Sequence, residues 1–508
     1  MNRRSFLKAS VAANLPAIVS RAAEPSTAGR MLFFDASNVR RCSGARLVAA
    51  PIEKLGPLIV GDNPADGDGA STCTAGSSVR MLNGRLRIYY TATRAGEQKR
   101  GICVAESGDG GNSWQKPSLG QIVLNGRDTN GVRITGIPDD VSTAGPCVIT
   151  MPDGRYRMYF WLYSKSPERT RYLAAESRDG LKWQAVNFDE PCLVHHHDGI
   201  PWVDRDGPAA WNSWRDANGT DQARFFALRR IRSNDCTTVY PSKGGGYDMY
   251  SVWLLPLAPD SPATLPDNLK GFMRVIQHRT SDDGLRWSEP VDMIIPQTDD
   301  PPDLQFYYLT SYPLLNLRIG FLGHYRVVAQ TMDAEFTYSE DGRQWVRPLR
   351  SSWFPRGPEG SADSLMVYMP NSLIDQGSHW LAVYTAAAFD HHEAAGKAPY
   401  QLHGLRIPRF RFAGLRSIAS DAILETKVFV LTEPQLVVDA DIYGSLKAEL
   451  SDPFGKALPG YRFEESIQVT GNSSEHRLAW KGTEVIMHRF DAVRLRLRWT
   501  GGTLYGVA

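Results

Sequence analysis

Aspartates recur in this sequence just before strand-like segments, and carboxylates in such a series could carry out acid–base chemistry. The five members of the series are Asp68, Asp140, Asp206, Asp303 and Asp363. Successive members are 72, 66, 97 and 60 residues apart. Carboxylates that converge on one site repel each other, and this repulsion separates their pKa values as acid–base catalysis requires. We expect Asp206, Asp68 and Asp140 to be catalytic, and Asp303 and Asp363 to bind substrate.

A single aspartate before a strand more often bonds its own backbone in a turn. It is therefore the repetition that indicates function, and it does so for the set rather than for every member. We expect two or three of the five to take part in chemistry.

Aromatic and imidazole side chains are dense between His195 and Trp214. Tryptophans near carboxylates suit sugars, whose C–H faces stack on aromatic planes. Three consecutive histidines cannot all face one site on an extended chain, so we expect one functional histidine there and no metal or cofactor. For Phe306–Tyr308, packing in the core is the safer expectation, and a place in the floor of the site is the other. The expected substrate-binding residues, besides the two aspartates, are Trp202, Trp211, Tyr308, His197 and His391.

A turn motif repeats through the middle of the chain, with Ser-x-Asp and Gly followed by Trp. Its copies are Ser107–Trp114, Ser177–Trp183, Ser281–Trp287 and Ser339–Trp345. Asp-Gly between strand-like runs predicts a hairpin turn, because glycine tolerates positive φ and aspartate bonds nearby amides. We expect each Trp to pack between neighbouring sheets. Strand-rich units that recur in this way predict a β-propeller.

The spacing predicts five blades. The Trp-to-Trp steps are 69, 104 and 58 residues, and we interpret Ser233–Gly271 as an insertion in the third blade. A fifth unit without the turn motif is expected over Ser364–Thr385. The predicted fold is all-β, with a five-bladed propeller over residues 30–412 and a β-sandwich over 425–508, where alternating segments lack the repeat. Six blades, with a degenerate first one, are the alternative.

The N-terminus has the order of an export signal. Arg3 and Arg4 precede Phe-Leu-Lys, a mildly apolar run and two small residues, and this resembles a twin-arginine signal over residues 1–23. An amphipathic first helix is the alternative. We therefore expect a periplasmic or secreted protein. The six cysteines lack metal-ligand spacing, which predicts buried thiols and leaves one or two disulfides open.

Charge and hydropathy exclude two classes of partner. There are 57 Lys and Arg against 55 Asp and Glu, and residues 1–23 hold four of the basic residues and no acidic one. The remaining chain thus carries 53 − 55 = −2, without the positive excess of a nucleic-acid binder. After the signal, no stretch reaches the roughly 18 apolar residues of a membrane span. We expect a monomer or a weak oligomer that binds carbohydrate.

These motifs resemble the five-bladed propeller glycosidases of the arabinanase, xylosidase and invertase superfamily, which often carry a C-terminal β-sandwich. Asp206-Gly-Pro resembles the Glu-Gly-Pro that holds the proton donor of the arabinanase branch. The resemblance implies that Asp68 is the base or nucleophile and that Asp140 orients the others. Asp206 is one methylene shorter than Glu, and the invertase motifs Trp-x-Asn-Asp-Pro and Glu-Cys-Pro are absent, which disfavours a fructosidase.

A closer similarity, to a group of exported proteins labelled as glycosyl hydrolases, covers the whole mature chain. It is carried by segments such as Asp303–Tyr308, Gly320–Tyr325, Phe354–Gly360, Gly444–Leu450 and Val493–Leu497. The similarity implies an exported glycoside hydrolase, but it fixes neither the sugar nor the linkage. Two other functions stay open: a glycan-binding propeller without catalysis, and a polysaccharide lyase that uses His391, His392 or Tyr308.

Overall fold

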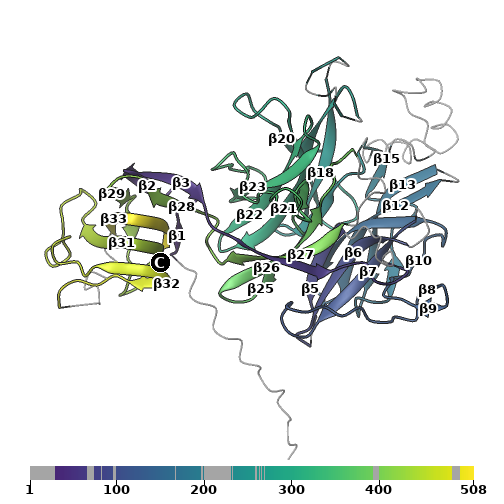
Figure 1. Ribbon diagram of the computed structural model, residues 1–508, viewed down its shortest axis with the longest axis horizontal. Helices are drawn as coiled ribbons and strands as arrows, with labels where there is room; N and C mark the ends of the chain where they lie inside the picture. Colours follow the sequence, from purple (N-terminus) through teal and green to yellow (C-terminus); the bar gives the residue numbers. More distant parts are fainter. Residues whose placement is uncertain are drawn as a thin grey trace, which may run out of the picture.

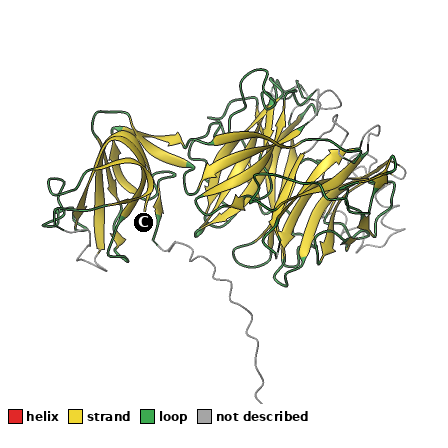
Figure 2. Ribbon diagram, turned by 60° about the horizontal axis from the view of Figure 1, so that its bottom comes forward, coloured by secondary structure: helices red, strands yellow, loops and turns green. Residues whose placement is uncertain are grey.

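The structure, a computed structural model, describes residues 29–65, 74–81, 83–94, 99–165, 168–195, 198, 230–231, 233–257, 260–262, 264, 266–267, 269–392, 400–482 and 492–508. All regular elements in these ranges are β-strands, as Figure 2 shows, and this confirms the predicted all-β class. No helix in the described ranges is long and apolar enough to cross a membrane.

Runs of antiparallel strands follow one another along the described chain, and we call them sheet units 1 to 5 (Figure 1). Unit 1 holds β5 (Thr74–Arg80), β6 (Leu86–Thr93) and β7 (Arg100–Ser107). Unit 2 holds β11 (Ser142–Thr150), β12 (Tyr156–Lys165), β13 (Glu168–Ser177) and β14 (Trp183–Ala185). Unit 3 holds β17 (Thr237–Pro241), β18 (Tyr247–Pro256), β19 (Phe272–Ser281) and β20 (Asp292–Ile294).

Units 4 and 5 are hydrogen-bonded into one larger sheet. Unit 4 holds β21 (Leu304–Leu314), β22 (Leu317–Arg326) and β23 (Thr331–Ser339). Unit 5 holds β24 (Met366–Tyr368), β26 (His379–Ala387), β27 (Gln401–Pro408) and, from the other end of the chain, β4 (Glu53–Ile59). Short strands flank the units: β8 (Val123–Leu124), β9 (Arg127–Asp128), β10 (Ile134–Thr135), β15 (Leu193–His195), β16 (Arg230–Ile231) and β25 (Ile374–Asp375).

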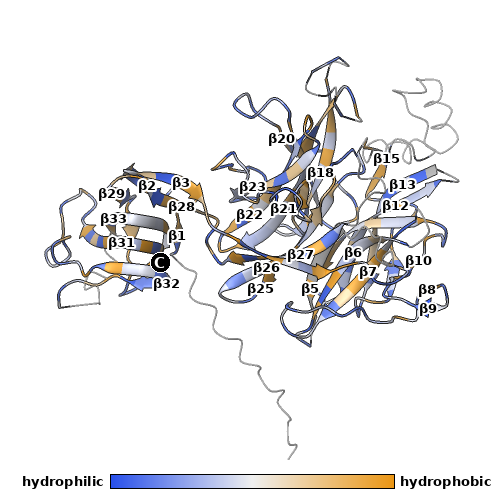
Figure 3. Cartoon of the chain, viewed as in Figure 1, coloured by the Kyte–Doolittle hydropathy of each residue, from blue (hydrophilic) through white to orange (hydrophobic). Residues whose placement is uncertain are grey.

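Neighbouring units pack face to face through apolar clusters, and Figure 3 shows hydrophobic residues running along the strands. One cluster joins units 1 and 2 around Tyr89 and Met158, and another joins units 2 and 3 around Tyr159 and Met249. Strand β5 also contacts β26 of unit 5, so the contacts return from the last unit to the first.

The predicted insertion over Ser233–Gly271 is wrong for its first part, which forms β17 and β18, the first two strands of unit 3. Gly245 and Gly246, with positive φ, lie in the turn between these strands. The second part, residues 257–271, is a long connection between β18 and β19, where unit 2 has only two residues between β12 and β13. The fifth strand-rich unit expected over Ser364–Thr385 is confirmed by β24 and β26.

A second domain is built on one nine-stranded sheet. Its strands are β1 (Met31–Leu32), β2 (Val39–Ser43), β3 (Ala45–Ala49), β28 (Ala413–Ser417), β29 (Ala422–Thr426), β30 (Phe429–Val430), β31 (Val437–Ser451), β32 (Val469–Arg477) and β33 (Ala492–Val507). The long strand β33 changes course at Gly501 and Gly502, where β31 shifts register. Both glycines have positive φ, and a Cβ on Gly502 would lie 2.3 Å from the Asp441 carbonyl oxygen. The sheet can therefore fold over its apolar face.

Residues 30–49 belong to this second domain, although the sequence placed them in the repeat domain. Strand β1 pairs with β33, β2 with β29 and β3 with β28. Without β1, β2 and β3, the strands that pair with them would have unpaired edges. No local sequence pattern predicts a pairing between segments so far apart. Aromatic rings join the domains: Phe34 packs 5.0 Å from Phe336 and 5.8 Å from Phe412.

Candidate functional site

The four predicted Asp-Gly turns adopt one hydrogen-bonding pattern. In each turn the Gly N–H donates to the Ser Oγ, at 2.8 Å for Gly111 and Gly180 and 2.9 Å for Gly284 and Gly342. The Asp carboxylate accepts two further backbone N–H groups in the turns at Asp179, Asp283 and Asp341. One carboxylate oxygen of each of these aspartates, Oδ1, thus holds its own turn.

Each of three turns also contacts the preceding sheet unit. The Tyr89 hydroxyl donates to the Gly180 carbonyl oxygen at 2.6 Å, Tyr159 to Gly284 at 2.9 Å and Tyr250 to Gly342 at 2.5 Å. The same tyrosines meet the rings of the turn tryptophans edge to face, with centroids 5.7–6.4 Å apart. This confirms that Trp183, Trp287 and Trp345 pack between neighbouring sheets.

The aspartates before the first strands lie at the opposite end of the units. In unit 2, Ser142 pairs with Tyr163, whereas Tyr156 pairs with Ser177 at the turn end. Asp140 stands two residues before β11, Asp303 directly before β21 and Asp363 three residues before β24. Asp140 is exposed, and Asp303 is partly exposed and 3.4 Å from Arg326.

Unit 3 has its aspartate at a position that the sequence analysis missed. Its first strand begins at Thr237, so the acid that precedes it is Asp235 and not Asp206. The run of β-branched and aromatic residues Thr237–Tyr240, with an aspartate two residues ahead, was the available signal, but it lay inside the supposed insertion. The predicted residues Asp68, Asp206, Trp202, Trp211 and His197 lie outside the described residues, and their roles stay predictions.

Asp235 is bound by groups from two sheet units. Its Oδ2 accepts hydrogen bonds from Arg274 Nε of β19 at 3.2 Å and from Ser233 Oγ at 2.9 Å. Its Oδ1 accepts one from the Tyr307 hydroxyl of β21 at 3.1 Å. The carboxylate remains 19% exposed, so it is both oriented and accessible.

Arg274 is buried and its charge is shared by two carboxylates. Besides Asp235, its Nη1 contacts Asp267, and the rings of Tyr307 and Tyr325 lie 5.4 and 5.1 Å from its guanidinium carbon. Gln305 Oε1 accepts from the Arg274 backbone N–H at 3.0 Å. Gln305 Nε2 and Asp267 Oδ1 are buried without a hydrogen-bond partner among the described residues.

His391 completes this group of residues, which we call the Asp235 cluster: Asp235, Asp267, Arg274, Tyr307 and His391. Its Nε2 lies 2.9 Å from the Tyr307 hydroxyl, and its backbone N–H donates to the Gln330 carbonyl oxygen at 2.8 Å. Burial, together with the nearby positive charge of Arg274, lowers the pKa of His391 below its usual value despite the neighbouring carboxylates. The imidazole is therefore neutral at pH 7.

Tyrosines from units 2 and 5 lie beside the Asp235 cluster. We call Tyr163, Tyr368 and Tyr400 the tyrosine group. The charges of Asp235 and Arg100 act on the Tyr163 hydroxyl. The ring centroids of Tyr368 and Tyr307 lie 6.2 Å apart. Burial raises the pKa of Tyr400 to about 12, so its hydroxyl stays protonated. These rings are partly exposed, and each offers a flat face and a hydrogen-bonding hydroxyl.

Two predicted substrate-binding residues make structural contacts. Asp363 accepts hydrogen bonds from Lys54 at 2.6 Å, Ser361 at 2.9 Å and Tyr384 at 3.1 Å, which fastens β4 to unit 5. Tyr308 is buried, and its hydroxyl accepts from the Met369 backbone N–H at 3.1 Å. The hydroxyl that contacts the Asp235 cluster is that of the neighbouring Tyr307, at an irregularity in the pairing of β21 with β22 between Phe306 and Leu309.

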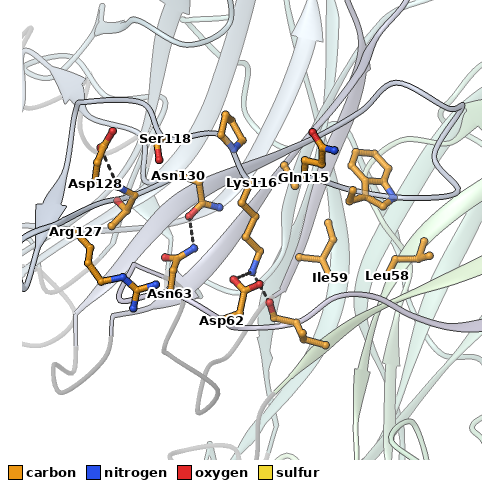
Figure 4. Close-up of a pocket in the computed structure, with 15 residues that line it drawn as sticks. Leu58, Ile59, Asp62, Asn63, Gln115, Lys116, Ser118, Arg127, Asp128 and Asn130 are labelled. Carbon is orange, nitrogen blue, oxygen red and sulfur yellow. Dashed lines mark hydrogen bonds and ion pairs between the residues drawn. The ribbon is translucent and has the colours of Figure 1, made fainter.

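A cavity of about 520 Å³ lies elsewhere, between the loop after β4 and the segment that follows β7 (Figure 4). Its polar side chains bind one another: Lys116 Nζ donates to Asp62 at 2.6 Å, and Asn63 Nδ2 donates to Asn130 Oδ1 at 3.0 Å. Asp128 accepts the Gly120 N–H at 2.8 Å. The polar side chains that line this cavity therefore bind one another and join units 1 and 5.

The described part of the chain contains no cluster of three or more His, Cys, Asp or Glu side chains arranged to hold a metal ion. Five cysteines fall within it, and all five are free thiols: Cys42, Cys103, Cys147, Cys192 and Cys236. Burial raises the pKa of the Cys236 thiol, next to Asp235, to about 12, so it is not a nucleophile at neutral pH.

No family model matches this chain, and no curated protein matches it. Among solved structures, a glycoside hydrolase is 12% identical with a TM-score of 0.45, over 71% of this chain and 92% of that one. An N-acetylgalactosamine deacetylase from F. plautii, in complex with blood group B trisaccharide, is 14% identical with a TM-score of 0.42, over 73% and 97%. A glycosyl hydrolase from Bacteroides ovatus is 13% identical with a TM-score of 0.41, over 70% and 94%.

Proposed function

We propose that this protein is an exported glycoside hydrolase and that units 1 to 5 are the blades of a five-bladed propeller with an appended β-sandwich. The pairing of β4 with β27 supports a ring that is closed by the N-terminal strand. Contacts of β5 with β11, of β11 with β17 and of β17 with β21 support first strands that line a common axis.

One observation carries the proposed activity: polar and aromatic side chains from separate units meet at one end of the first strands. Asp235 and Arg274 come from unit 3, Tyr307 from unit 4 and His391 from the segment after β26. A carboxylate beside partly exposed tyrosines suits a sugar, because hydroxyls bond to the acid while C–H faces stack on the rings.

The mechanism uses paired carboxylates. Asp206 protonates the leaving oxygen, Asp68 attacks or activates water, and Asp140 orients the donor. Asp235 is a further carboxylate of unit 3 at this end of the strands, since it stands two residues before β17. A separation of about 5–5.5 Å between the working pair would give retention of configuration, and about 6.5–9.5 Å would give inversion.

A polysaccharide screen read for new reducing ends tests this proposal. On a substrate that is cleaved, Asp206→Asn tests the acid, because loss of a general acid lowers the rate by about 10²–10⁴-fold, and Asp235→Asn tests whether the Asp235 cluster is needed for cleavage. Asp153→Asn, in an exposed hairpin turn, is the control. If no glycan yields reducing ends, or if both aspartate variants keep the full rate, the proposed mechanism is wrong.

A polysaccharide lyase is the second candidate, favoured by the contact between His391 and Tyr307. A neutral imidazole could take the proton beside a uronate carboxylate. The same screen separates the two activities, because a lyase releases an unsaturated product that absorbs in the near ultraviolet. A glycan-binding propeller would retain saccharide on an affinity column and release no product.

Export is part of the proposal and rests on the paired arginines of the N-terminal segment. Replacing Arg3 and Arg4 by lysine should retain the protein in the cytosol, because the twin-arginine pathway recognises the arginine pair itself. The measurement is the fraction of full-length protein in the periplasm or medium. Unchanged export of the double variant would contradict this route.

A further inference from the structure

The Tyr307 hydroxyl is hydrogen-bonded to both Asp235 and His391. It is 3.1 Å from Asp235 Oδ1 and 2.9 Å from His391 Nε2. A tyrosine hydroxyl has one proton to donate, and an ionised carboxylate can only accept. Because Arg274 and Ser233 already donate to Asp235, the carboxylate has the acceptor role, and Tyr307 donates to it.

The proton on Tyr307 therefore fixes the tautomer of His391. Once its hydroxyl points to Asp235, Tyr307 can only accept a hydrogen bond from the imidazole, so His391 Nε2 carries a proton. In the neutral ring the other nitrogen, Nδ1, then bears the lone pair. No described residue is hydrogen-bonded to Nδ1, and His391 is only partly buried.

We propose that His391 is a catalytic base whose Nδ1 takes the proton of the water that attacks the glycosidic bond. The inference rests on the proposed hydrolysis and assigns water activation to His391 instead of Asp68. The water O–H bond breaks as the Nδ1–H bond forms, and the water oxygen bonds to the anomeric carbon as the bond from that carbon to the leaving oxygen breaks. The leaving oxygen receives its proton from the acid. Tyr307 and Asp235 act as positioning residues for the imidazole.

The charges around His391 are consistent with a neutral base. The positive charge of Arg274 lowers the pKa of His391, and the negative charges of Asp235, Asp267 and Asp390 raise it. The rings of Tyr307 and Tyr325 pack against the imidazole, with centroids 5.2 and 4.8 Å away, and the Tyr325 hydroxyl donates to Gln330 at 2.8 Å. Base activity should therefore be present above the lowered pKa of His391 and be lost as the pH falls through it.

Nitrogen NMR of the histidine-labelled full-length protein tests the tautomer without any substrate. The spectrum of His391→Gln assigns the signal, and we expect Nε2–H with an unprotonated Nδ1 at pH 7. Tyr307→Phe should remove this preference, whereas Tyr308→Phe, a loss of the adjacent buried hydroxyl, should keep it. An Nδ1–H tautomer in the unmodified protein would overturn the inference even if glycans are cleaved.

Activity on a cleaved glycan tests the base. Gln at position 391 can still donate to Tyr307 but cannot accept a proton, so His391→Gln should lower kcat by about a hundredfold or more and leave KM nearly unchanged. It should also abolish the acidic limb of the pH profile. A full rate for His391→Gln would mean a structural role and overturn the proposal. If the protein cleaves no glycan, the proposed hydrolase function is wrong. The NMR experiment, which needs no substrate, still determines the tautomer of His391.

Discussion

Arg274 illustrates how strongly a single buried charge can depend on its partners. The guanidinium is 1% exposed and faces Asp267, which is fully buried, as well as Asp235. Such a pair contributes little net stability relative to apolar residues, but removing one partner leaves an uncompensated charge.

Arg274→Met should therefore destabilise the protein by about 3–5 kcal/mol at neutral pH. The double variant with Asp267→Asn should recover a large part of this loss, because the amide that remains is uncharged. Chemical denaturation of the single and double variants measures the effect. Equal stabilities of the two variants would show that Asp267 is not charged in the folded protein.

Asp363 gives a pH-dependent prediction. Burial opposes its ionisation, but hydrogen bonds from Lys54, Ser361 and Tyr384 outweigh burial and lower the pKa of this carboxyl. A lowered folded-state pKa contributes stability above the unfolded pKa, and this contribution is lost as the pH falls through the folded value. Asp363→Asn should cost about 1–3 kcal/mol at pH 7 and progressively less below the ordinary carboxyl range. A cost that is the same at every pH would contradict this.

At the scale of elements, the Asp-Gly turns were predictable because every interaction that forms them is local. Ser, Asp, Gly and Trp lie within eight residues of each other, so the sequence contains the whole hydrogen-bond pattern. Asp235 was missed for the opposite reason. Its partners Arg274, Tyr307 and His391 are 39, 72 and 156 residues away, and nothing in the short run Thr237–Pro241 reveals them.

Two glycines with positive φ allow the cost of backbone strain in a turn to be distinguished from the cost of a steric clash between units. Gly154 and Gly180 have φ of +82° and +68°, but a Cβ on Gly154 meets nothing within 4 Å, whereas one on Gly180 would lie 2.6 Å from the Tyr89 hydroxyl. Gly154→Ala should cost about 1 kcal/mol and Gly180→Ala about 2–4 kcal/mol. The shift in the urea midpoint measures both. Equal costs for the two variants would mean that the Tyr89 side chain moves away from the added methyl group without loss of stability.

At the scale of the whole molecule, the described residues begin and end in the second domain. Strands β1, β2 and β3 pair there with strands that follow Phe412, and the units between them account for most of the chain. The class of the fold and its strand-rich repeats followed from periodicity. This long-range pairing did not, because partner choice depends on edges and on buried area that only the folded sheet creates.

A variant that begins at Pro51 should therefore weaken the second domain more than the sheet units. It keeps β4, which unit 5 requires, but leaves β28 and β29 without partners on one side. Limited proteolysis should cut within residues 425–508 faster than in the intact protein, while residues 60–405 stay protected. Equal cleavage rates would show that β1–β3 add no stability.

The register of β1 has a consequence for biosynthesis. Met31 stands opposite Val507, so the two ends of the described chain are neighbours. Strand β1 can therefore pair only after residues 506 and 507 have been synthesised, whereas β2 and β3 pair with the earlier strands β29 and β28. Joining the two ends with a short linker and opening the backbone at an exposed loop should accordingly give a circularly permuted protein that folds earlier during translation.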